Sequence, residues 1–380
     1  MSEPTNEPPL VTRTDLPLVA PVAPAQTTRP RPGLLEAVVW CGLFVATQLL
    51  GAIIGTGVVF GTLMYSAADP KAFADEQLDG FGKAVDLKSE GERSPIPDEI
   101  GRSLASGMLA AQFASLGLIL LVLPRRIGPD WARQIGLRRP HPLHVFLALL
   151  LVPAFMICAD LIQTLFLWAT GMKPPPVVKA LNGVFGSFPW PLTALAVAVG
   201  PGVVEELWCR GFLGRGLCAR YGIPVGVLFT AVLFAAMHLD PSQLVVITLM
   251  GLYLHFVYLA ARSIWVPILL HATNNGLAIL LALVLKVGDS QGNVEVPLAV
   301  HVLAFSLLLF GSVALWTSRA EIVPVRGAGN EPWQPESPGV SAPPDGVKMR
   351  LVYVAFSPAA VLCAVASFGA LAVLLYQLSR

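Results

Sequence analysis

The chain has 380 residues, of which 55% are hydrophobic and 13% charged, against roughly 25% charged residues in soluble domains. This composition excludes an ordinary soluble domain and indicates a protein that lies largely in a lipid bilayer. The net charge of +1 gives no indication of a nucleic-acid partner, and none is expected.

The N-terminal segment, residues 1–33, contains eight prolines, three acidic residues and three arginines. It lacks the basic start and short apolar core of a secretory signal. We therefore expect a disordered, Pro-rich N-terminal tail.

Long apolar segments dominate the rest of the chain. A helix needs roughly 20 apolar residues to cross the hydrocarbon core of a bilayer. The sequence therefore predicts an all-α, polytopic membrane protein, a bundle of about eight to nine transmembrane helices. The candidate spans are about 34–65, 103–123, 143–170, 190–213, 222–238, 241–260, 263–285, 298–317 and 351–377.

The loops between these spans differ in charge. Loop 66–100 has nine acidic and four basic residues, whereas loop 124–142 has five arginines and one aspartate. Short loops rich in Lys and Arg stay in the cytoplasm. Alternation through the spans then places the N-terminus in the cytoplasm, and we expect a bacterial inner (plasma) membrane location.

The polar stretches divide the chain into four parts. We expect the tail at 1–33, a transmembrane bundle at 34–317, a Pro/Gly-rich linker at 318–350 and an additional C-terminal transmembrane helix at 351–380.

Ionisable residues inside apolar spans are informative, because a charge at the centre of such a helix costs about 2.5–3.5 kcal/mol on insertion scales. Glu36 lies at a span edge and Asp160 well inside the third span, and we interpret both as structural. Glu205 and Glu206 stand together deep in the fourth span.

Neighbouring residues on a helix point about 100° apart, so the two glutamates cannot face the same way. Glu206 and Arg210 have the i,i+4 spacing that favours an ion pair. Glu205 then remains free to act as a general base. The alternative at this point is a purely structural Glu–Arg pair with a passive second acid.

Two histidines add to this pattern. His238 ends the fifth span, and His271 lies inside the seventh span with Asn275 one turn later on the same helix face. Such a His/Asn pair can donate two hydrogen bonds to one small target, for example a tetrahedral oxyanion. His255 and His301 have no acid or amide partner one helical turn away, and we interpret them as structural.

Together these residues resemble the CAAX-protease and bacteriocin-processing (CPBP) family of intramembrane glutamic endopeptidases. The family pattern is E-E-x-x-x-R, then F-x-x-x-H, then H-x-x-x-N. The chain has these three parts in order and inside apolar spans, over about residues 190–285: Glu205-Glu206…Arg210, Phe234…His238 and His271…Asn275.

The resemblance implies an endopeptidase with its catalytic core at 190–285, and it assigns a role to each of these residues. Glu205 would activate a water that His238 helps to hold, and His271 and Asn275 would stabilise the oxyanion. Glu206, Arg210 and Phe234 would support the site. The implied substrate is a membrane-anchored or lipid-anchored protein or peptide, cleaved at the lipid bilayer without a cofactor.

Two alternatives remain. Glu205, His238 and His271 can also form a three-ligand zinc set, although no H-E-x-x-H motif is present. A non-enzymatic membrane scaffold or a transporter can also place carboxylates inside the membrane.

Overall fold

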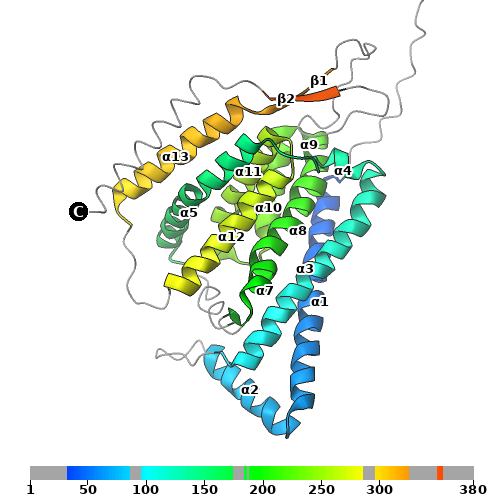
Figure 1. Cartoon of the computed structure of the whole chain (residues 1–380), viewed down its shortest axis with the longest axis vertical. Coiled ribbons are helices and arrows are strands. Elements are labelled where there is room, and N and C mark those ends of the chain that lie inside the picture. Colours follow the sequence, from blue (N-terminus) through cyan, green and yellow to red (C-terminus); the bar gives the residue numbers. More distant parts are fainter. Residues whose placement is uncertain are drawn as a thin grey trace, which may run out of the picture.

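The structure is a computed structural model that describes residues 32–85, 96–173, 184–185, 188–285, 296–324 and 349–353. Within these ranges nearly all regular structure is helical (Figure 1). The tail predicted over 1–33 lies outside the described residues except for its last two. The C-terminal helix predicted over 351–380 lies outside them from residue 354 onward.

The all-α membrane fold predicted from the sequence is confirmed. Six helices are long and apolar enough to cross a membrane, and two shorter apolar helices accompany them, so the first eight predicted spans are all helical. The six are Leu34–Ser66 (α1), Asp98–Ile127 (α3), Pro142–Thr170 (α5), the composite helix Trp190–Tyr221, Pro241–Ala261 and Leu298–Thr317 (α13). The two shorter helices are Ile223–Ala236 (α10) and Trp265–Leu281, the described apolar part of Trp265–Leu285 (α12).

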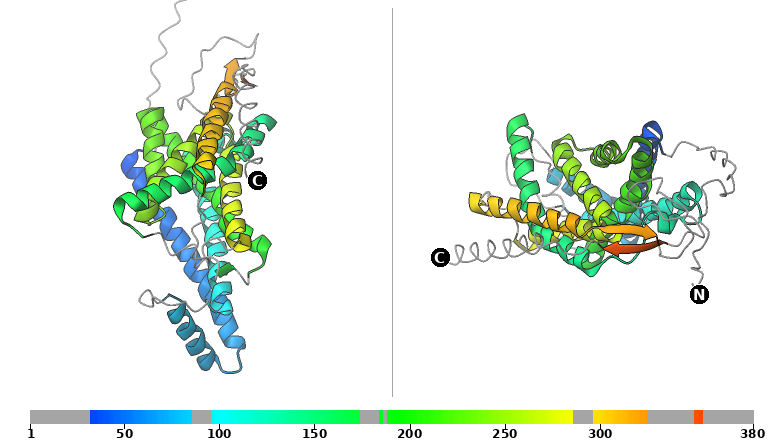
Figure 2. Two further views of the ribbon diagram at one scale, coloured as in Figure 1. Left: turned by 90° about the vertical axis from the view of Figure 1, so that its left-hand side faces the viewer. Right: turned by 90° about the horizontal axis from the view of Figure 1, so that it is seen from above.

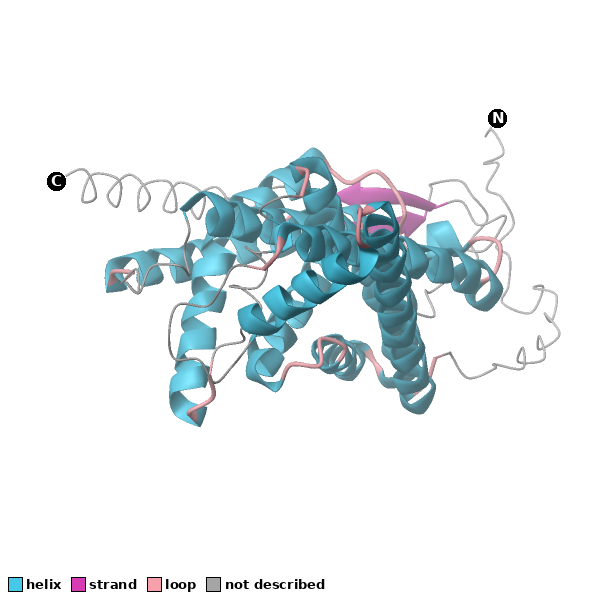
Figure 3. Cartoon of the chain, turned by 90° about the horizontal axis from the view of Figure 1, so that it is seen from below, coloured by secondary structure: helices cyan, strands magenta, loops and turns pink. Residues whose placement is uncertain are grey.

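Several smaller elements were not predicted. They are the helices α2 (Pro70–Val85) and α4 (Trp131–Gln134) and the strands β1 (Ala320–Pro324) and β2 (Met349–Tyr353). The strands pair antiparallel, with Ala320 opposite Tyr353, and form one small ribbon at the edge of the helical bundle (Figure 3). The segment predicted as a linker over 318–350 therefore has strand structure at both ends, and β2 continues into the start of the predicted ninth span.

Helices α1 and α3 pack side by side in antiparallel orientation and extend beyond the other helices, with α2 across their far end (Figures 1 and 2). At 33 residues, α1 is about 50 Å long, which exceeds the roughly 30 Å hydrocarbon core of a bilayer. Small residues let the two backbones approach closely, as at many membrane helix interfaces. A Cβ at Gly107 on α3 would lie 2.6 Å from the carbonyl oxygen of Ala52 on α1.

The composite helix Trp190–Tyr221 is the most buried of the six long helices. Its most apolar 18-residue window is 56% buried, whereas the corresponding windows of the others are 17–44% buried. On one side Trp208 stacks on Phe44 of α1, with ring centroids 5.1 Å apart. On another side the helix contacts α12. The residues that resemble a protease motif are thus held in the centre of the bundle.

We predict that Gly107→Ala lowers the free energy of unfolding by about 1–3 kcal/mol, because the new methyl group overpacks the α1–α3 interface. The measurement is unfolding of the purified protein in detergent. Gly117→Ala is the matched control on the same helix, since a Cβ at Gly117 meets no atom within 4 Å. Equal stability of the two variants would contradict the close packing of α1 on α3.

Candidate active site

Glu205 and Glu206 end the short helix α8 (Gly200–Glu206) in the middle of the composite helix. Two π-helical segments flank α8, namely η1 (Leu195–Val199) and η2 (Leu207–Gly214). Such wider turns are rare and occur often at functional sites. These wider turns were not predicted from the sequence, because most residues of this span are apolar and a change of helical period leaves no clear pattern in them.

Arg210 on η2 is fully buried and contacts three elements at once. It donates a hydrogen bond of 2.6 Å to Glu206 Oε1, which confirms the predicted i,i+4 pair. It donates another of 2.9 Å to the carbonyl oxygen of Gly251 on α11 (Leu244–Ala261). Its guanidinium group also lies 4.7 Å from the ring centroid of Phe234 on α10, a cation–π distance. Arg210 therefore ties α10 and α11 to the helix that bears the glutamates.

His271 on α12 lies between the two glutamates. Its Nδ1 is 2.9 Å from Glu206 Oε1 and its Nε2 is 3.9 Å from Glu205 Oε2. Because a carboxylate only accepts hydrogen bonds, the short contact assigns the proton to Nδ1. The second distance is too long for a direct hydrogen bond. Glu206 thus orients the ring so that Nε2 faces Glu205.

The two carboxylates differ in solvent exposure as well as in hydrogen-bond partners. The Glu206 side chain is 0% exposed and bonded to Arg210 and His271, whereas the Glu205 side chain is 15% exposed. One oxygen of each carboxylate, Glu205 Oε2 and Glu206 Oε2, is buried and has no hydrogen-bond partner within the described part of the chain. The two acids therefore differ in the bonds that Glu206 Oε1 makes and in the partial exposure of Glu205.

Phe234 on α10 contacts three other predicted site residues. Its buried ring makes edge contacts with His238 and His271, at centroid distances of 5.0 and 6.0 Å, in addition to its contact with Arg210. His238 Nδ1 donates to the Phe234 carbonyl oxygen at 2.9 Å, which leaves Nε2 as the open ring nitrogen. His238 itself is exposed.

Asn275 lies on α12 one turn beyond His271, with its neighbour Asn274 beside it. Asn274 Nδ2 donates to Asn275 Oδ1 at 3.2 Å. This contact occupies the oxygen of Asn275 and leaves its amide N–H groups available.

Close packing of α8 on α12 makes these contacts possible. A Cβ at Gly202 would lie 2.9 Å from Ala272 Cβ and 3.0 Å from the Ala272 backbone nitrogen. Only glycine fits at this point, three residues before Glu205 and opposite the residue that follows His271. The Gly-Pro-Gly sequence before the glutamates thus has a packing role.

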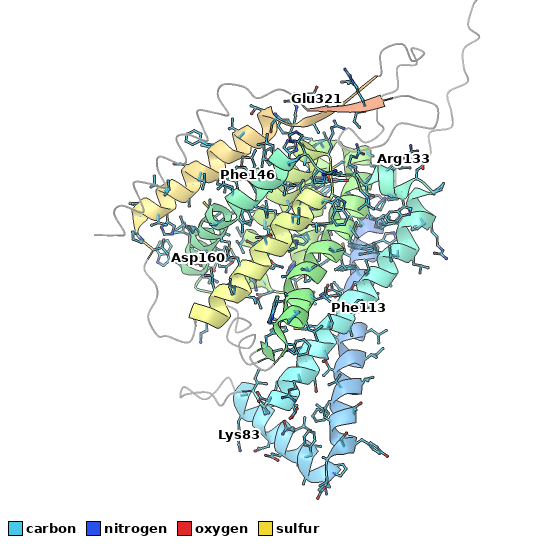
Figure 4. The ribbon with its side chains drawn as sticks, in the orientation of Figure 1. Lys83, Phe113, Arg133, Phe146, Asp160 and Glu321 are labelled. Carbon is cyan, nitrogen blue, oxygen red and sulfur yellow. The ribbon has the colours of Figure 1, made fainter. Side chains whose placement is uncertain are left out.

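The other two acidic residues singled out in the predicted spans, Glu36 and Asp160, lie away from this cluster. Glu36 pairs with Arg126 at the α1–α3 contact. Asp160 is exposed on α5, and Figure 4 shows it on the side of the bundle away from α3. His255 is buried with its Nε2 3.8 Å from Cys218 Sγ. Among the described residues, no group of three or more His, Cys, Asp or Glu side chains is arranged to hold a metal ion.

We predict that Gly202→Ala lowers any activity of this site at least tenfold, because the added methyl group forces α8 away from α12 and lengthens the contact between Glu206 and His271. Gly276→Ala on α12 is the matched control, since its Cβ would make an ordinary contact of 3.7 Å with Ala198. Turnover of the two variants in detergent is compared with that of the wild type. Full activity of Gly202→Ala would contradict this packing role.

Comparison with known proteins identifies the same segment of the chain. Residues 187–277 match a family model described as "Rce1-like: Type II CAAX prenyl endopeptidase Rce1-like". No match was found among curated proteins or among solved structures. The matched segment includes all seven residues of the three-part pattern, and the resemblance noted in the sequence is thereby confirmed. Residues 187–277 of this integral membrane protein are therefore similar to the Rce1-like family of type II CAAX prenyl endopeptidases.

Proposed function

We propose that the chain is an intramembrane glutamic endopeptidase that cleaves a membrane-associated or lipid-anchored protein or peptide. The observation that supports this most is that two adjacent glutamates differ in their hydrogen-bond partners and in their exposure. Glu206 is held by Arg210 and His271, whereas Glu205 is partly exposed and faces the open nitrogen of His271.

In the proposed reaction, the Glu205 carboxylate removes a proton from a water molecule. The water oxygen attacks the carbonyl carbon of the scissile peptide bond and forms a tetrahedral oxyanion. Glu205 then returns the proton to the leaving nitrogen, and the C–N bond breaks to give a carboxylic acid and an amine. Transfer of the acid proton to the amine leaves a carboxylate and an ammonium group. His238 helps to hold the water through Nε2, the nitrogen that its bond to Phe234 leaves open.

Asn275 and His271 are proposed to stabilise the oxyanion. Asn275 offers its amide N–H groups to the oxyanion, while its oxygen accepts a hydrogen bond from Asn274. His271 donates its Nδ1–H to Glu206, so it can donate from Nε2 only when the ring is doubly protonated. A preorganised donor of this kind is typically worth a factor of about 10²–10³ in rate.

The proposed partner is a membrane-anchored substrate, and the proposed setting is a bacterial inner membrane with the N-terminus in the cytoplasm. The orientation has structural support, because the arginine-rich segments meet at one end of the bundle. Loop 135–138 bonds to the turn between α11 and α12: Ile264 N to Gly136 O at 3.0 Å and Ser263 Oγ to Arg138 O at 2.6 Å. Helix α2, in the acidic loop, lies at the opposite end (Figure 1).

We predict that Glu205→Gln lowers the turnover number by a factor of about 10³ or more, because the amide cannot accept the proton of the water. The measurement is cleavage of a panel of membrane-anchored peptides by the protein in detergent, with and without a chelator. Asp160→Asn is the control for loss of a carboxylate inside a span. Wild-type cleavage that survives Glu205→Gln would overturn the assignment of the base.

The chelator arm separates the glutamic mechanism from the zinc alternative. Cleavage that persists after chelation supports a water activated by Glu205 alone. Cleavage that stops with the chelator and returns with zinc would instead favour a metal held by Glu205, His238 and His271. A wild-type protein that cleaves no peptide, together with a cellular function that Glu205→Gln leaves intact, would favour a non-enzymatic role.

We predict that Asn275→Asp lowers the turnover number by a factor of about 10²–10³. The substitution keeps the shape of the side chain but replaces the amide donor by a group that repels the oxyanion. The Michaelis constant should change little, because the oxyanion exists only in the transition state. An unchanged turnover number would exclude Asn275 from the oxyanion site.

A further inference from the structure

The turn between α10 and α11 sets the position of His238. Helix α10 ends at Ala236, so His238 lies beyond its last regular residue, and its backbone N–H bonds to the Ala235 carbonyl oxygen at 3.1 Å. The next residue, Leu239, has a φ of 55°, in the left-handed region that a leucine rarely adopts. The His238 ring is bonded to the Phe234 carbonyl oxygen of α10, but the backbone that carries it already belongs to the turn, so contacts to the turn also affect its position.

Asp240 stabilises this turn from within. Its carboxylate accepts hydrogen bonds from the backbone N–H of Ser242 at 2.9 Å, from Ser242 Oγ at 2.6 Å and from Gln243 Nε2 at 2.9 Å. The hydrogen bond from Ser242 is also the main reason why the pKa of Asp240 lies below its usual value. These bonds shape residues 240–243 but do not attach the turn to the rest of the bundle.

Gln163 on α5 provides that attachment. Its Nε2 donates a hydrogen bond of 2.8 Å to the carbonyl oxygen of Ser242, across 79 residues of sequence. Its Oε1 is buried and has no hydrogen-bond partner among the described residues. A buried unpaired acceptor in an otherwise apolar helix is unfavourable, so the bond to Ser242 has to offset the cost of placing a glutamine there.

We propose that Gln163 is a positioning residue for the proteolytic reaction: through the Ser242 carbonyl it fixes the turn 238–243 and thereby aims His238 at the water beside Glu205. The proposal rests on the proposed function. It extends the site beyond the matched domain, because α5 lies outside residues 187–277. Gln163 acts through the turn and does not touch substrate.

The test compares the wild type with Gln163→Leu and Gln163→Glu in detergent. Leucine removes the amide, and glutamate keeps its length but lacks the N–H donor. Asp160→Asn is the matched control, since Asp160 lies on the same helix one turn earlier and is exposed. Hydrogen exchange of the backbone amides at 238–243 reports on the turn without requiring activity, and peptide cleavage reports on turnover.

We expect both Gln163 variants to raise the exchange rate of this turn by a factor of about 3–10, the equivalent of one hydrogen bond. Turnover should fall by a similar factor while the Michaelis constant stays within about twofold, because the aim of His238 matters to the chemical step. Asp160→Asn should change neither quantity.

Unchanged exchange at 238–243 in both Gln163 variants would overturn the proposal, as would faster exchange with unaltered turnover. Failure of the proposed function has a different signature. It would be seen if the wild type cleaved no peptide and the Glu205→Gln variant kept the cellular function. That result would count against proteolysis and against a catalytic purpose for the turn, whatever the exchange rates are.

Discussion

The buried guanidinium of Arg210 is the interaction on which the site depends. Placing a charge in a low-dielectric interior costs several kcal/mol unless good partners surround it. Here Glu206, the Gly251 carbonyl oxygen and the face of Phe234 meet that need, and each belongs to a different helical segment. The same carboxylate then orients His271. Four helices, with the composite helix Trp190–Tyr221 counted as one, therefore share one electrostatic cluster. Loss of Arg210 would leave a buried carboxylate without its counter-ion and disturb all of them.

This cluster explains how two identical neighbours acquire different tasks. Glu205 and Glu206 are adjacent, so the helix points them in different directions. One direction leads to Arg210 and full burial, and the other leads to a partly exposed position near His271. The π-helical turns on both sides of α8 alter the spacing of side chains along the same helix. Gly202 then lets α12 come close enough for His271 to reach both acids.

Parts of the chain outside the matched domain support the site from several sides. Helix α1 covers Trp208 through Phe44 and Trp40, so the residues between Glu206 and Arg210 are sealed from lipid. Helix α5 reaches the turn after His238 through Gln163. The arm formed by α1, α2 and α3 extends well beyond this core. Small residues let α1 and α3 pack closely, and α3 contacts the helix that bears the glutamates.

The sequence by itself determined the membrane class, the eight helical spans that the structure describes and the Glu206–Arg210 pair, because hydropathy and i,i+4 spacing are local properties. It also indicated the resemblance to CAAX-type proteases that the match over residues 187–277 supports, since the three motifs recur in order. Only the tertiary structure decided that His271 bonds to Glu206 and merely faces Glu205, that Phe234 joins both histidines, and that Gln163 holds the His238 turn. These contacts link residues on different helices, as does the pairing of β1 with β2. Their geometry depends on how the helices pack, and spacing along one chain does not contain that information.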